Sequence, residues 1–186
     1  MKNRLLLTIV SLLMVASLAM ASVPSPTAND LYNATLTMPD GSPAPEGLSV
    51  SLVPENETTA QLLLKIMQAM QGQPIVNTYF ADVLEAIRAV LPEGTDLAAL
   101  QLHELAALAV NGCPENICDL VLCLTCPTLF DTLKPVAVLV GLVENDRVNW
   151  HVLRAAPNAR GGVDVTLPSA LLLSIQAGNA VFAILQ

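Results

Sequence analysis

All four cysteines of this chain lie within fourteen residues, with the spacing C-x4-C-x4-C-x2-C. They are Cys113, Cys118, Cys123 and Cys126. Four cysteines allow three disulfide pairings. If residues 117–126 are helical, Cys123 and Cys126 lie on neighbouring turns, so the spacing favours the pairs 113–118 and 123–126. If the segment folds back on itself, the pairs become 113–126 and 118–123.

The same cysteines have other uses as thiolates. We expect no cofactor. The alternative is a zinc ion, because four thiolates match the ligands of a tetrahedral zinc site. The last three have the spacing of a plant-type iron–sulfur cluster, and Cys123-Leu-Thr-Cys126 has the form of a redox pair. An exported protein meets an oxidising compartment, which favours structural disulfides over these alternatives.

The rest of the sequence contains no catalytic motif. A Gly-x-Ser-x-Gly elbow, His-Glu-x-x-His, a phosphate-binding glycine loop and an acidic calcium loop are all absent from it, so we expect no enzyme. His103 and His151 fall on polar faces of their predicted elements. Trp150 lies on an apolar face and is expected in the core. Asn33 and Asn56 begin N-glycosylation triplets.

The N-terminus has the features of an export signal. Lys2 and Arg4 precede an apolar run from Leu5 to Met20, and Ala19-Met-Ala21 is typical of a cleavage site. Residues 1–21 are therefore predicted to be a signal peptide, and the protein to be secreted, periplasmic or at the cell surface, without a later transmembrane segment. The net charge of −8 argues against nucleic acid as a partner.

Residues 22–30 contain two prolines and are predicted to be a flexible arm. Residues 31–186 are predicted to form a single α+β domain with β structure in 31–54 and 135–186. Alternation predicts strands over 32–38 and 48–52 that pair with each other. Residues 57–134 are predicted to be a four-helix insertion, with helices near 57–72, 78–91, 96–110 and 115–133. Further strands are predicted over 136–143, 148–152, 163–167 and 180–185, with a helical turn over 168–177.

The expected fold is therefore a small antiparallel sheet or sandwich of about six strands, with the helices inserted between strands two and three. The first hairpin, Ala34-Thr-Leu-Thr-Met-Pro-Asp40-Gly-Ser-Pro-Ala-Pro-Glu-Gly-Leu-Ser-Val-Ser-Leu52, resembles the opening of carboxypeptidase-regulatory-like domains. That resemblance covers about twenty residues and implies a transthyretin-like β-sandwich, a module of many exported proteins.

These observations favour an exported, non-enzymatic structural or interaction module of the cell envelope or extracellular space. A protein partner or self-association would then be its mode of action. The alternative is a carrier of lipid or another apolar ligand, with the Leu- and Met-rich helices as the cavity wall. A second alternative is a thiol-redox protein or a four-thiolate metal protein.

Overall fold

The computed structural model describes residues 33–52, 56–70, 75, 80–125, 134–144 and 147–186. The predicted signal peptide, residues 1–21, and the predicted arm, residues 22–30, lie outside the described residues. So does Cys126.

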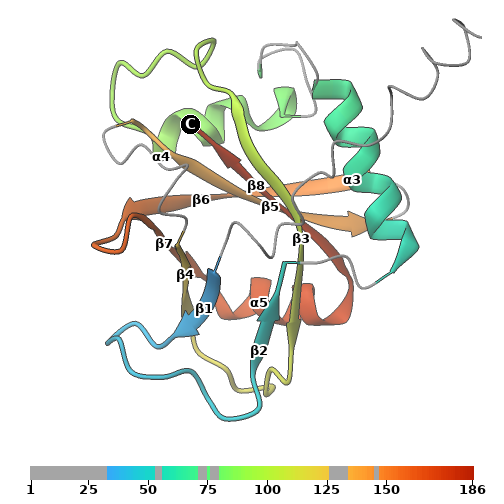
Figure 1. Ribbon diagram of the computed structural model, residues 1–186, viewed down its shortest axis with the longest axis vertical. Helices are drawn as coiled ribbons and strands as arrows, with labels where there is room; N and C mark the ends of the chain where they lie inside the picture. Colours follow the sequence, from blue (N-terminus) through green and yellow to red (C-terminus); the bar gives the residue numbers. More distant parts are fainter. Residues whose placement is uncertain (1–32, 53–55, 71–74, 76–79, 126–133, 145–146) are drawn as a thin grey trace, which may run out of the picture.

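Within the described residues, eight strands form one antiparallel sheet in the order β1-β4-β7-β6-β5-β8-β3-β2 (Figure 1). The sheet curls into a nearly closed, barrel-like shape, so that its edge strands β1 and β2 approach each other. A single isolated bridge, Thr37 to Pro43, joins the end of β1 to the turn that follows it. The strands are β1 (Asn33–Thr37), β2 (Ser49–Ser51), β3 (Leu102–Asn111), β4 (Leu120–Thr125), β5 (Ala137–Glu144), β6 (Arg147–Pro157), β7 (Gly162–Leu167) and β8 (Asn179–Leu185).

The central strands β5 and β8 are apolar on both faces. Their side chains alternate between two hydrophobic cores, as the pleat requires. In β8, Phe182 and Ile184 point into the inner core, which the curled sheet encloses, while Val181 and Ala183 point into the outer core. Because neither face of these strands meets water, both need a cover.

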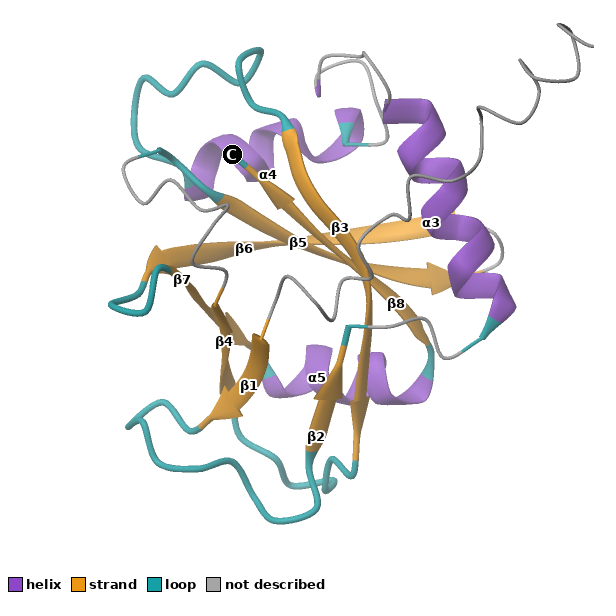
Figure 2. Ribbon diagram, in the orientation of Figure 1, coloured by secondary structure: helices purple, strands orange, loops and turns teal. Residues whose placement is uncertain are grey.

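Helices provide the cover on the outer face and complete it on the inner face (Figure 2). The outer core receives Ile66 and Ile87, both fully buried, from α3 (Glu57–Met70) and α4 (Leu84–Val90). A short 3-10 turn, η2 (Ala81–Val83), precedes α4. The inner core receives Leu172 and Ile175 from α5 (Ser169–Ala177). No helix within the described ranges is long and apolar enough to cross a bilayer.

Several predicted elements are confirmed. The strands predicted over 32–38 and 48–52 are β1 and β2, and the four strands predicted after residue 135 are β5 to β8. The first predicted helix is α3, and the helical turn predicted over 168–177 is α5. The predicted pairing of the first two strands is wrong, since β1 pairs with β4 and β2 pairs with β3.

The predicted fold class is wrong. The helices predicted over 96–110 and 115–133 are replaced by β3 and β4, so the described chain is mostly β, with three short helices instead of a four-helix insertion. An eight-stranded barrel-like sheet also replaces the expected six-stranded sheet or sandwich. In β3, Ala106, Ala107 and Leu108 are buried in succession. A strand buried on both faces has no alternation by which to distinguish it from a buried helix.

A glycine makes room for the only tryptophan. Gly141 on β5 pairs with Trp150 on β6, and the indole ring packs edge-on against Phe80 with ring centroids 4.8 Å apart. A Cβ atom at position 141 would lie 2.8 Å from Trp150 Cζ3 and would also meet Val148 Cγ1. The contact between Trp150 on the sheet and Phe80 beside the outer helices therefore depends on a residue without a side chain at position 141.

We predict that Gly141→Ala destabilises the protein by about 1–3 kcal/mol, the usual cost of overpacking. Urea denaturation followed by tryptophan fluorescence measures this free energy of unfolding. Gly178→Ala is the matched control, because the nearest atom to its Cβ would be Ser174 O at 3.6 Å, and it should change stability by less than about 0.5 kcal/mol. Equal stability of the two variants would contradict the prediction.

Candidate functional site

The cysteine segment is extended rather than helical. Cys113 and Cys118 lie in the connection between β3 and β4, and Cys123 lies on β4. All three are free thiols in the structure. The predicted 113–118 and 118–123 disulfides are therefore wrong, because the spacing argument assumed a helix or a fold-back that does not form. The 123–126 and 113–126 pairs involve a residue outside the described ranges.

The three described thiols have different surroundings. Cys113 is buried, and burial raises the pKa of its thiol. Its backbone N–H donates to Gln176 Oε1, and its carbonyl accepts from Gln176 Nε2 at 3.3 Å. Burial also raises the pKa of the half-buried Cys123 thiol, and Asp164 adds to that effect. A redox-active cysteine needs the opposite shift. Cys118 is exposed.

A four-thiolate zinc site is not assembled from the described part of the chain. No group of three or more His, Cys, Asp or Glu residues gathers there in an arrangement that could hold a metal ion. Cys113 enters the inner core, while Cys123 points to the opposite face of β4 from Leu122 and Leu124. The Cys113 and Cys123 thiols therefore lie on opposite sides of the sheet.

The two histidines do not meet. His103 lies on β3, at an irregularity in its pairing with β8, and His151 lies on β6. Two strands, β5 and β8, separate β6 from β3, so the two strands that carry the histidines lie about 14 Å apart at roughly 4.8 Å per step. Both were expected on solvated faces, yet both are partly buried. Burial lowers the pKa of His103, and the nearby Lys134 charge lowers it further.

Trp150 is buried in the outer core, as the sequence predicts. The two glycosylation candidates differ. Asn33 is an exposed residue at the start of β1. Asn56 is exposed but its amide is already used: Oδ1 accepts from Thr59 N at 3.0 Å, and Nδ2 donates to Asn179 Oδ1 at 2.6 Å. Asn56 therefore caps α3 and ties it to the start of β8.

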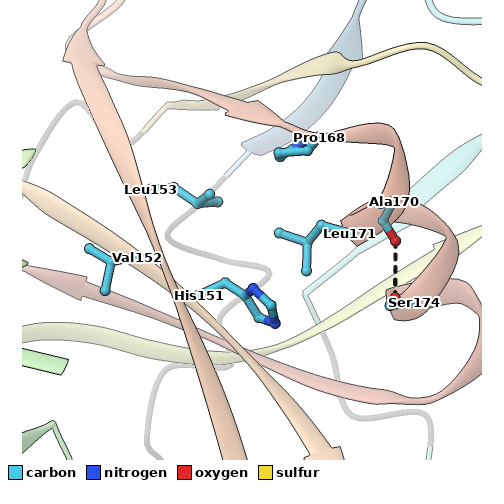
Figure 3. Close-up of a pocket in the computed structure, with 7 residues that line it drawn as sticks. All are labelled: His151, Val152, Leu153, Pro168, Ala170, Leu171 and Ser174. Carbon is cyan, nitrogen blue, oxygen red and sulfur yellow. Dashed lines mark hydrogen bonds between the residues drawn. The ribbon is translucent and has the colours of Figure 1, made fainter. Parts of the chain in front are cut away.

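A groove between β6 and α5 is a candidate binding site. It encloses about 310 Å3 and is open to solvent on one side. Pro168, Ala170, Leu171 and Ser174 line it from the α5 side, and His151, Val152 and Leu153 line it from β6. Figure 3 shows the His151 ring directed toward Leu171 and α5. The wall is therefore mostly apolar, with one imidazole and one hydroxyl.

His151 is the unusual group of this groove. Its Nε2 is buried and has no hydrogen-bond partner among the described residues. Ser174 does not supply one, because its hydroxyl donates to Ala170 O at 3.0 Å (Figure 3). A buried polar atom without a partner costs free energy that a bound group could recover. With a small rotation of the ring, this nitrogen would offer a bound molecule one hydrogen bond within apolar walls.

Sequence reasoning placed His151 on a polar strand face and missed the groove. The burial of His151 could have been predicted from Leu153 and Ala155, which lie on the same face of the strand and pack against the inner core. Their apolar character marks that face as partly buried. The α5 wall could not be found in the same way, because nothing in the sequence places residues 168–174 beside residue 151.

Comparisons with protein-family models, with curated proteins and with solved structures find no match to this chain.

We predict that iodoacetamide at about pH 8 modifies Cys118 well before Cys113 and Cys123. Cys118 is exposed, whereas burial raises the pKa of the other two thiols and leaves less thiolate at that pH. Peptide mass spectrometry over a labelling time course gives the three rates. Raising the pH should speed Cys123 labelling as its thiol ionises. Simultaneous labelling of all three at pH 8 would contradict these environments.

We predict that Asn56→Ala lowers the free energy of unfolding by about 1–2 kcal/mol, because it removes the cap of α3 and the bond to Asn179. Chemical denaturation measures the loss. Asn33→Ala is the control and should have an effect within about 0.5 kcal/mol. A glycan on Asn56 would replace one of the two Nδ2 hydrogens and add bulk beside the bond to Asn179, so Asn56 is the poorer acceptor of the two. Equal effects of both alanine variants would contradict the capping role.

Proposed function

We propose that this protein is an exported, non-enzymatic binding module that takes up a small molecule with an apolar body and one hydrogen-bonding group. The groove between β6 and α5 is the binding site. The observation that carries this proposal is the buried, unpartnered His151 Nε2 beside an apolar wall. The export signal in residues 1–21 supports the location.

The size of the groove limits the ligand. Its volume of about 310 Å3 is at the small end for binding pockets. At about 30 Å3 per non-hydrogen atom, the share of a water molecule in the liquid, it holds roughly ten atoms. A medium-chain alcohol or acid fits this volume, whereas a two-chain lipid does not.

The chemistry of the groove supports binding rather than catalysis. A serine nucleophile needs its hydroxyl within hydrogen-bond reach of a base, and the Ser174 hydroxyl is directed to Ala170 O instead. That bond is the common one from a helical serine to the carbonyl four residues earlier. Ser174 then retains its acceptor lone pairs toward the groove, so His151 and Ser174 together can orient a hydroxyl or carboxyl group.

This ligand site is not the one that the sequence suggested for a carrier. The predicted cavity wall was the helical segment, but α3 and α4 pack onto the sheet through the fully buried Ile66 and Ile87, and Phe80, which precedes η2, is buried in the same core. Buried side chains from the described parts of these helices therefore cover that face of the sheet. The proposed site lies on the other side of β6, where α5 leaves an open groove.

We predict that 1-octanol, which is about the size of the groove, binds there. Two-dimensional NMR of the full chain should show shifts centred on His151, Leu171 and Ser174. His151→Phe keeps a ring but removes the hydrogen bond, and should weaken binding about fivefold, the equivalent of about 1 kcal/mol. Ala170→Trp, at an exposed position that lines the groove, should abolish the shifts.

Ala177→Trp is the matched control, because Ala177 is exposed on the same helix and does not line the groove. It should bind as the unaltered protein does. Shifts that persist in Ala170→Trp, or an affinity unchanged in His151→Phe, would overturn the proposal. An absence of shifts in the unaltered protein would do so as well.

A further inference from the structure

Two sulfur atoms from distant parts of the chain lie together on the surface. Cys118 Sγ is 4.0 Å from Met38 Sδ, although the residues are 80 positions apart. Met38 follows β1 and packs against the inner core, and Cys118 lies in the exposed connection from β3 to β4. One sulfur is thus held by packing, while the other is accessible from solvent.

We propose that Cys118 and Met38 form a binding site for a soft monovalent metal ion, Cu(I) being the natural one. A thiolate and a thioether are the ligands that select Cu(I) over harder ions. Binding needs no change of oxidation state, because the ion enters as Cu(I). Cys118 releases its thiol proton to solvent, and its sulfur then donates an electron pair to the metal.

The distance between the sulfurs suits such an ion. A bond from sulfur to a first-row metal is about 2.3 Å. At the observed separation of 4.0 Å, two bonds of that length meet at an angle of about 120°. This angle belongs to a three-coordinate ion, so the third position is open to an external ligand such as a thiol. Little movement of either side chain is needed.

The nearest carboxylates on these segments are held by other groups. Asp40 Oδ1 accepts from Ser42 N at 2.9 Å and from Ser42 Oγ at 2.6 Å. Asp119 Oδ1 accepts from Ser169 N at 2.8 Å. One oxygen of each of these carboxylates is therefore already used within the protein. Ca2+ needs six to eight oxygen ligands, and a structural Zn2+ site needs four protein ligands, so a pair of sulfur atoms suits neither ion.

The other described thiols do not belong to this site. Cys123 Sγ lies 3.9 Å from Thr37 Oγ1 on the outer face of β4, whereas Met38 packs toward the inner core. Cys113 is buried in that core. Burial raises the pKa of both thiols, so both keep their protons more firmly. They therefore serve as internal controls for the role of Cys118.

The test is a Cu(I) titration of the reduced full-length chain against a chromophoric Cu(I) chelator. Met38→Leu is the decisive variant, because it keeps every thiol and nearly the same volume. It should lower the Cu(I) affinity roughly ten- to a hundredfold, the range seen when support of a metal site is removed. Cys118→Ser should lower it at least as much, while Cys123→Ser should leave it unchanged.

X-ray absorption of the one-to-one complex gives a second readout. It should show two protein sulfur ligands in the unaltered chain and one fewer in Met38→Leu. Circular dichroism and urea denaturation of each variant confirm that it is folded. An affinity unchanged by Met38→Leu would mean that thiols alone bind the metal, and would overturn the proposal. Loss of binding in Cys123→Ser with retention in Cys118→Ser would overturn it too.

Discussion

The structure depends on the burial of both faces of β5 and β8. Fully buried side chains such as Val138, Leu139, Phe182 and Ala183 alternate between two cores along these strands. At about 25 cal/mol per Å2 of apolar surface, leaving either face in water would be costly. The helices α3 and α4 cover one face. The sheet curls over the other face, and α5 completes that cover.

The two candidate sites lie on the inner side of this arrangement. The curl leaves a groove where α5 runs beside β6, and His151 takes part in that groove because it shares a strand face with Leu153 and Ala155. The same curl brings β1 beside β4. The connection leading into β4 thus meets the residue that follows the first strand, and Cys118 reaches Met38. Each site combines segments that only the curled sheet brings together.

Elements with one dominant face were predictable from the sequence, and elements with two buried faces were not. Alternation in Thr35, Leu36 and Thr37 identified β1, and the polar stripe of α3 identified a helix that packs one side on the sheet. Residues 102–111 bury side chains on both sides, and a continuous apolar run fits a helix as well as a strand. The helix assumed over residues 96–110 placed His103 on a solvated face, and the helix assumed over residues 117–126 led to the wrong disulfides.

By itself, the sequence determined the helices and strands that expose one face and bury the other, such as α3 and β1. It also determined the burial of Trp150 and the clustering of thiols between residues 113 and 126, because these properties follow from neighbours along the chain. Only the tertiary structure decided that β1 pairs with β4, that His151 faces α5, and that Cys118 meets Met38 rather than Cys113 or Cys123. Those contacts join residues far apart in sequence. They are selected by the need to cover both faces of the central strands at once.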